Sequence, residues 1–144
     1  MAAQTKALFD LTVLVDALIG EAADQPDSIA ALQLVTNGEV DGYLCATAID
    51  SLNDILSRSH GSLRARSQLV ELRSMLNIAP VDAVVVDAAM ALEWEYFDDA
   101  LTHECARVNG IDRLVTLNPH DFINPSISIL APVEFLKEVQ TARA

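Results

Sequence analysis

The sequence predicts an α/β fold in which a mainly parallel sheet of about five strands carries helices on both faces. Two observations support this fold class. Apolar runs of strand length alternate along the chain with segments whose apolar residues recur at helical spacing. The first run, residues 7–15, is almost continuously apolar, as expected of a strand that is buried on both faces. With 144 residues and no internal repeat, the chain is expected to form one domain, residues 1–144.

Each expected strand is a short apolar run that begins or ends at a turn signal. The second strand, GYLCA, follows Asn37-Gly38, and the fourth, RLVT, follows Asn109-Gly110. The third, NIAPV, separates two helical patterns, and the fifth ends just before Pro132. The expected strands cover residues 7–15, 42–46, 77–81, 113–116 and 127–130.

The expected helices lie between these strands. Asn-Gly pairs stop two of them, Gly61 separates two others, and Pro132 is well placed to begin the last. Thr47 offers an N-cap, with Asp50 three residues further on. The expected helices cover residues 17–23, 27–36, 47–60, 63–76, 82–93, 97–108 and 132–139.

The charge balance limits the kinds of function that fit the chain. A net charge of -12 argues against a protein that binds nucleic acid through a broad basic surface. It is compatible with a nuclease whose acidic pocket is neutralised by divalent ions, or with a basic partner. No apolar run is long enough for a transmembrane helix, and the N-terminus does not resemble an export signal. We therefore expect no membrane association. Cys45 and Cys105 lack metal-ligand spacing and no export signal is expected, so we expect a reduced, cytoplasmic protein.

The segment FDLTVLVDAL places Asp10 inside the first apolar run. An unpaired carboxylate in an apolar interior is costly, so Asp10 must have a partner or a function. Three interpretations remain open: Asp10 ends the strand and caps the following turn, attacks phosphorus as a nucleophile, or holds a metal ion. Asp16, at the other end of the segment, is expected to cap the next helix or to face solvent.

Several polar residues are expected at the edge of the sheet where ligands bind. In open parallel sheets, ligands sit beyond the carboxyl ends of the strands. Asp10 and the segments 47–51 and 116–121 follow three of the expected strands. We therefore expect them to lie near one another at that edge.

The chain resembles the PIN-domain proteins, a ribonuclease fold that includes VapC-type toxins. The likeness covers nearly the whole chain and rests on three segments that occur in the family's order. FDLTVLVDAL is similar to the opening strand with its acid. YFDDALTHECARVNGIDRLVTLNPHDF is similar to the second half, where an acid near a helix start precedes an apolar strand and a Thr-x-Asn turn. ISILAPVEFL is similar to the closing strand and helix.

The resemblance implies a metal-dependent endoribonuclease, possibly a toxin of a toxin–antitoxin pair. Water can cleave a phosphodiester when a bound ion activates it and offsets the charge that builds on the phosphate, and Mg²⁺ or Mn²⁺ does both through oxygen ligands. Carried over residue by residue, the resemblance makes Asp10, Asp99 and Asp121 the catalytic acids. The same three residues and Asn118 are the implied metal ligands. The supporting residues are Thr116, Ser51, Thr12 and Asp98.

The chain departs from the family pattern in four places. Ser51 stands where the family places an acid in the helix after the second strand. Asp54 lies about 60° round the helix from Ser51 but is expected to face solvent, and Asp50 lies on a different side. Thr12 replaces a common asparagine or serine, and Leu117 replaces a frequent arginine. Tyr96 stands where one branch of the family has an acid. Since serine is a poor Mg²⁺ ligand beside a carboxylate, the first departure bears most directly on activity.

Two other functions remain open. The chain could be a PIN-like domain that binds a partner without cutting RNA, for example an antitoxin that reaches the acids with an arginine. With either function, the resemblance and the apolar helices of residues 27–76 lead us to expect a homodimer. The opening segment also resembles the haloacid-dehalogenase-like phosphatases, but Thr12 occupies the position of their second aspartate. His103 and Cys105 do not form a zinc site by spacing, and Trp94 and Tyr96 are expected to have core or interface roles.

Overall fold

Five parallel strands form the sheet, in the order β3-β2-β1-β4-β5. The computed structural model describes residues 4–21, 23 and 25–143. The strands are β1 (Thr5–Phe9), β2 (Val40–Cys45), β3 (Asn77–Ala79), β4 (Arg113–Val115) and β5 (Ser128–Leu130). The predicted α/β class and the five-stranded parallel sheet are therefore confirmed.

Seven α-helices and one 3₁₀ helix join the strands in the described residues. They are α1 (Leu11–Ile19), α2 (Gln25–Thr36), α3 (Ala48–His60), α4 (Ser62–Met75), α5 (Ala83–Leu92), α6 (Phe97–Val108), η1 (Pro119–Asp121) and α7 (Pro132–Arg143). Most of these bounds agree with the expected helices to within a few residues. No helix in the described ranges has the length and apolar character needed to span a membrane.

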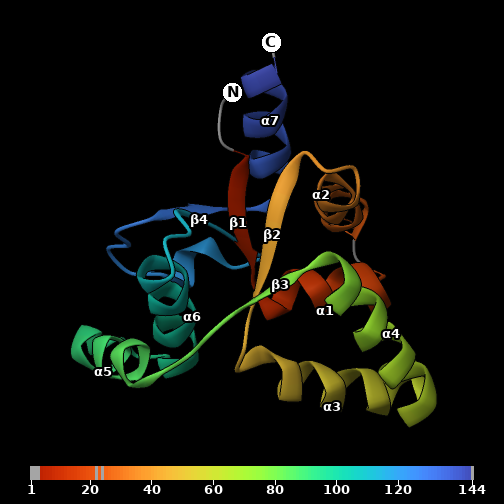
Figure 1. Cartoon of the computed structure of the whole chain (residues 1–144), viewed down its shortest axis with the longest axis horizontal. Coiled ribbons are helices and arrows are strands. Elements are labelled where there is room, and N and C mark those ends of the chain that lie inside the picture. Colours follow the sequence, from red (N-terminus) through yellow and green to blue (C-terminus); the bar gives the residue numbers. More distant parts are fainter. Residues whose placement is uncertain (1–3, 22, 24, 144) are drawn as a thin grey trace.

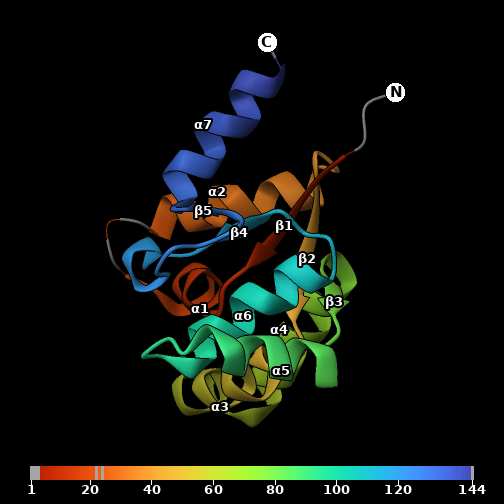
Figure 2. The ribbon, with the colours of Figure 1, turned by 90° about the vertical axis from the view of Figure 1, so that its left-hand side faces the viewer.

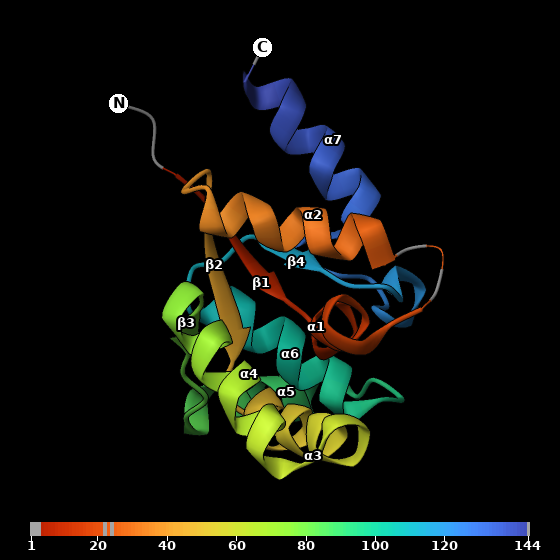
Figure 3. The same cartoon turned by 90° about the vertical axis from the view of Figure 1, so that its right-hand side faces the viewer.

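Alternate residues of each strand contribute to two cores, one on each face of the sheet. Ala7 and Phe9 pack in the core under α1, α2, α3, α4 and α7, whereas Leu8 packs in the core under α5 and α6. Figures 1 and 2 show α5 and α6 together on one side, and Figure 3 shows α2 crossing the opposite side of the strands. Phe135 of α7 meets the edge of the Phe9 ring at a centroid distance of 6.0 Å. Helices thus cover both faces, as predicted.

The predicted strand over residues 7–15 is wrong in its second half. β1 ends at Phe9 and α1 begins at Leu11, because Asp10 is the N-cap of that helix. The Asp10 side chain accepts a hydrogen bond from the Leu11 amide, and its carbonyl accepts one from the Val13 amide. The apolar run therefore contains a buried strand followed by a buried helix, which an unbroken apolar pattern does not distinguish. α1 ends at Ile19, so the helix expected over 17–23 extends too far.

The predicted role of Asp16 is also wrong. Its side chain is buried within α1 and accepts a hydrogen bond from the Ser28 hydroxyl of α2 at 2.7 Å. Because α1 begins earlier than predicted, Asp16 lies near the helix end and faces α2 instead of capping the helix or facing solvent. Thr47 lies at the N-cap of α3, but its hydroxyl contacts the Cys45 sulfur at 3.2 Å and does not cap.

Candidate functional site

The candidate site lies at the carboxyl ends of β1 and β4. The chain leaves β1 towards β2 and β3 on one side, and later reaches β4 and β5 on the other. Strand order therefore reverses between β1 and β4, where adjoining connections diverge and leave room for a ligand. Asp10 directly follows β1 and Thr116 directly follows β4. The topology thus brings these two residues together, as expected.

Three donors satisfy the Asp10 carboxylate, which is 8% exposed. One oxygen accepts from the Leu11 amide at 2.9 Å. The other accepts from the Thr116 hydroxyl at 2.7 Å and from the Thr12 hydroxyl at 3.0 Å. The interpretation of Asp10 as a cap is therefore confirmed, and its hydrogen bonds explain how a carboxylate is tolerated beside an apolar run.

The two threonines connect Asp10 to the segment after β4. Each hydroxyl has one proton, which it donates to Asp10, and so each is left to accept from a backbone amide. Thr12 accepts from the Leu117 amide at 3.2 Å, and Thr116 accepts from the Asn118 amide at 3.1 Å. The carboxylate, two side chains and two backbone amides form one continuous network.

Burial makes the ionised form of Asp10 unfavourable despite these bonds. Desolvation raises the pKa of Asp10, the hydrogen bonds from Thr116, Thr12 and Leu11 lower it, and the charge of Asp98 raises it again. The net effect is a pKa above the ordinary value. A nearby cation would favour the ionised form and lower this pKa.

Asp99 belongs to the same electrostatic neighbourhood. It lies in the first turn of α6, as predicted, and its pKa is raised to about 6. Burial is the largest cause, followed by the charges of Asp98, Asp10 and Asp121, and no basic side chain is among the causes. The carboxylates of Asp10, which follows β1, and of Asp121 in η1 therefore both lie close enough to Asp99 to repel its charge.

These acids do not form a ready-made metal cage. In the described part of the chain, no three or more His, Cys, Asp or Glu side chains converge closely enough to hold a metal ion. Asp98 and Asp121 are exposed, and Asn118 is linked to the network through its backbone amide. The structure thus joins Asp10, Thr12 and Thr116 by contact, and adds Asp98, Asp99 and Asp121 by charge alone.

Ser51 is not part of the network. It is exposed on α3, and none of the hydrogen bonds described above reaches it. Asp54 is also exposed and pairs with Arg58 at 3.0 Å, so the expectation that it faces solvent is confirmed. α3 therefore contributes no carboxylate to this edge in the described structure.

The donor set nevertheless fits a hard divalent cation in its chemistry. All the candidate ligands offer oxygen, and most are carboxylates. Burial first, and then the charges of neighbouring acids, raise the pKa values of Asp10 and Asp99, and no basic side chain is among the causes. A cation at this position would relieve that repulsion.

Hollows occur both beside the acids and away from them. A shallow one of about 370 Å³ is lined by α1, Ile55 and Leu117, and it includes Thr12. Two others, of about 320 and 330 Å³, flank α4 and are mainly apolar. The hollow beside Thr12 is the one that adjoins the network.

A second polar cluster on α6 escaped the sequence interpretation. His103 and Glu104 are buried, although only the apolar residues of this helix were expected to face inward. Trp94 packs on His103 at a ring centroid distance of 5.0 Å and meets the edge of Phe122 at 6.0 Å, which confirms a core role for Trp94. His103 and Glu104 follow the buried Ala100 by three and four positions, which places all three on one face of α6. This spacing was the available sequence signal for their burial. Tyr96 is half exposed.

The comparison with protein-family models identifies one family. A family model described as "PIN domain" matches residues 6–120. The comparison with curated protein sequences gives no match.

Solved structures share the fold at low sequence identity. The VapBC2 structure from Rickettsia felis, bound to a DNA fragment of its promoter, aligns with a TM-score of 0.66 and 19% identity, covering 88% of this chain and 97% of that chain. A toxin–antitoxin complex from Klebsiella pneumoniae gives 0.66 and 21% identity, with the same coverage of 88% and 97%. VapC20 of Mycobacterium tuberculosis, a toxin that cleaves the sarcin–ricin loop, gives 0.60 and 17% identity, covering 75% and 86%.

Proposed function

Since the chain belongs to the PIN-domain family, we propose that it is a metal-dependent endoribonuclease of the toxin type. The carrying observation is the fixed carboxylate of Asp10 at the strand-order reversal, where its charge and that of Asp121 both raise the pKa of Asp99. One of the similar structures is a toxin that cleaves RNA, and two contain toxin–antitoxin systems. Membership of the family also removes the phosphatase interpretation of Asp10.

Asp10, Asp99, Asn118 and Asp121 would hold Mg²⁺ or Mn²⁺, which supplies an activated water and offsets charge on the phosphate when it is bound. Thr12 and Thr116 orient the Asp10 carboxylate through their hydroxyl donors. Asp98 adds negative charge that strengthens attraction for a cation.

Ser51 limits how strongly such an ion would be held. Without a carboxylate on α3, the proposed ligand set comes from β1's end, α6 and the segment after β4. We therefore expect the wild-type chain to bind the ion less tightly than a variant with an acid at position 51. A Ser51→Asp variant tests this, and we expect tighter Mn²⁺ binding by calorimetry.

Exposed arginines at the turn between α3 and α4 support a polyanionic substrate. Although the chain is strongly acidic, three of its nine basic residues lie between positions 58 and 66. Arg58, Arg64 and Arg66 are all exposed. We propose that this turn contacts RNA phosphates while the acids and their ion act on the scissile bond.

The apolar surface of α4 favours a second candidate function, which is protein binding. We propose that the chain acts in the cytoplasm as a single domain. Leu63 and Val70 are 86% and 65% exposed, and an apolar hollow lies on each flank of the helix. We propose a small antitoxin protein as the partner, whose apolar segment covers this surface and whose arginine reaches the acids. A homodimer through the same helices is the alternative occupant.

One comparison separates the enzyme from the pure binding module. The wild-type chain and Asp10→Asn are incubated with single-stranded RNA and Mn²⁺, with Thr102→Val as a control outside the network. If the chain is an enzyme, the wild type and the control cleave the RNA and Asp10→Asn does not. If the wild type leaves RNA intact and Asp10→Asn keeps full affinity for the genomically adjacent antitoxin, the binding module is the correct function.

A further inference from the structure

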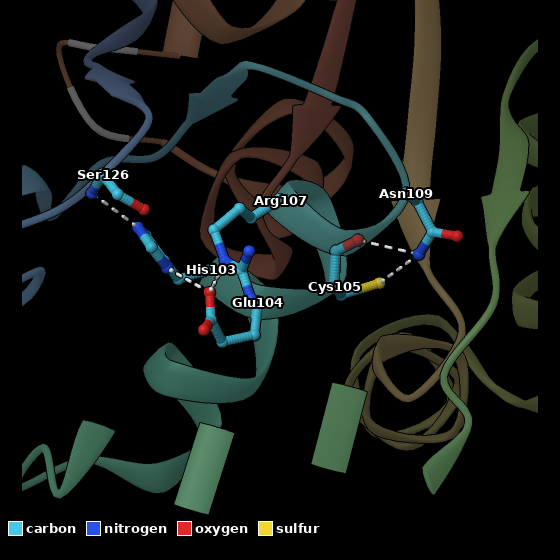
Figure 4. A network of polar contacts seen from close by, with 6 residues as sticks. All are labelled: His103, Glu104, Cys105, Arg107, Asn109 and Ser126. Atoms are coloured by element: carbon cyan, nitrogen blue, oxygen red, sulfur yellow. Dashed lines mark hydrogen bonds and ion pairs between the residues drawn. The ribbon is translucent and has the colours of Figure 1, made fainter. Parts of the chain in front are cut away.

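A polar cluster centres on two buried residues of α6, His103 and Glu104 (Figure 4). Their partners are exposed: Arg107, also on α6, and Ser126 in the segment before β5. His103 is 1% exposed and Glu104 is 4% exposed. Such groups are costly to bury unless their hydrogen bonds are satisfied. The pattern of donors and acceptors around them fixes the state of the imidazole ring.

Glu104 is ionised in this cluster. Burial acts to raise its pKa, but the hydrogen bonds from Arg107 and His103 and the charge of Arg107 outweigh burial and lower it. Arg107 donates from Nε to the Oε2 oxygen of Glu104 at 2.8 Å, and His103 Nδ1 lies 3.0 Å from the same oxygen. Because an ionised carboxylate only accepts, Nδ1 of His103 must carry a hydrogen and donate it.

The other ring nitrogen of His103 must be an acceptor. The Ser126 backbone N–H donates to Nε2 at 3.1 Å, so this nitrogen has a lone pair and no hydrogen. His103 is therefore a neutral imidazole, with both nitrogens assigned by their partners. A ring with hydrogens on both nitrogens would set two N–H groups against each other at Ser126.

This hydrogen bond spans two parts of the chain that carry candidate ligands. His103 lies one turn after Asp99 on α6, and Ser126 lies in the segment that begins with Asn118 and Asp121. Phe122, which follows Asp121, packs edge-on against Trp94, and Trp94 in turn packs on His103. The loop that holds Asp121 is thus attached to the helix that holds Asp99 by one hydrogen bond and by the aromatic contacts that Trp94 makes with Phe122 and His103.

We propose that His103 is a positioning residue, whose neutral ring, oriented by Glu104, holds the loop 118–126 against α6 and so sets the separation of Asp121 from Asp99. The effect on a metal ion rests on the proposed function, whereas the attachment of the loop does not. Partners that orient metal-binding groups from outside the ligand set typically change metal affinity by about 10–100-fold when they are removed.

Two substitutions of His103 separate its hydrogen bonds from its shape. His103→Phe keeps a ring against Trp94 but removes both bonds, whereas His103→Gln places an amide oxygen where it can accept from Ser126. Amide hydrogen exchange of residues 118–126 and Mn²⁺ affinity by calorimetry are measured on the full chain. We expect His103→Phe to speed exchange in this segment and weaken Mn²⁺ binding about tenfold, and His103→Gln to restore most of both.

A second pair of variants changes the other partner of this hydrogen bond, Ser126. Ser126→Pro deletes the donor N–H, and Ser126→Ala keeps it as the matched control. We expect Ser126→Pro to reproduce the effects of His103→Phe, and Ser126→Ala to behave as the wild type.

Several outcomes would overturn the proposal. Unchanged exchange in residues 118–126 of His103→Phe and Ser126→Pro would show that the bond does not hold the loop. Faster exchange throughout the chain, with no rescue by His103→Gln, would show a purely structural role. A wild-type chain that binds no Mn²⁺ would refute the proposed function and the metal effect, while exchange alone would still decide whether His103 holds the loop.

Discussion

Replacing Thr116 with valine should destabilise the protein chiefly through Asp10. Thr116 is fully buried, and valine has nearly the same shape, so the change removes a hydroxyl with little change in packing. The Asp10 carboxylate loses its shortest hydrogen bond, at 2.7 Å, and a hydrogen bond to a charged group contributes about 1.5–3 kcal/mol. The Asn118 amide also loses its acceptor, but Asn118 is exposed and water can replace it. We expect a loss of about 2–3 kcal/mol in the free energy of unfolding at neutral pH.

The assay is urea denaturation of a double-mutant cycle at positions 10 and 116. In an Asp10→Ala background, Thr116→Val should cost about 1 kcal/mol or less, because the charged acceptor is gone. Thr102→Val is the matched control, since its hydroxyl donates to the Asp98 carbonyl at a more exposed position. The reasoning is refuted if Thr116→Val costs no more than Thr102→Val, or costs the same with and without Asp10.

Three further predictions follow from other contacts. Because the pKa of Asp99 is raised from 3.8 to about 6, its contribution to stability is present below pH 3.8 and is lost as the pH rises through 6. Asp99→Asn should therefore flatten this part of the pH profile of thermal unfolding. An unaltered profile would contradict the assignment of this pH dependence to Asp99. Ser28→Ala removes the donor to buried Asp16 and should cost about 1–3 kcal/mol in urea denaturation, whereas a cost below about 0.5 kcal/mol would show that Asp16 has another donor. The double variant Arg64→Ala, Arg66→Ala should weaken RNA binding at low salt and reduce its salt dependence, measured by fluorescence anisotropy; equal affinity would exclude this turn as a contact.

The alternation of strands and helices was predictable because helices cover both faces of the sheet and bury its central strands. Every strand had to be a short apolar run, and every helix that crosses the sheet had to be amphipathic. The boundary at Asp10 was not predictable from this pattern, because Asp10 and Thr12 are isolated polar residues in a run that is otherwise apolar through both the strand and the helix. The capping preference of aspartate was the available signal, and it competed with two other uses for the same side chain.

The site was predictable where chain topology decides it. Asp10 and Thr116 follow neighbouring strands, so they had to meet at one edge. Asp16, His103 and Glu104 were not predictable as buried residues, because apolar spacing does not reveal polar side chains that are satisfied inside the protein. Their partners come from α2, from α6 itself and from the segment before β5, and only folding brings the distant ones within reach.

Anomalous scattering from crystals soaked in Mn²⁺ tests the central claim most directly. The account predicts one strong peak within ligand distance of both Asp10 and Asp99, and its loss in crystals of Asp10→Asn soaked in the same way. A map with no peak between these carboxylates, at Mn²⁺ concentrations that support RNA cleavage in solution, would contradict it.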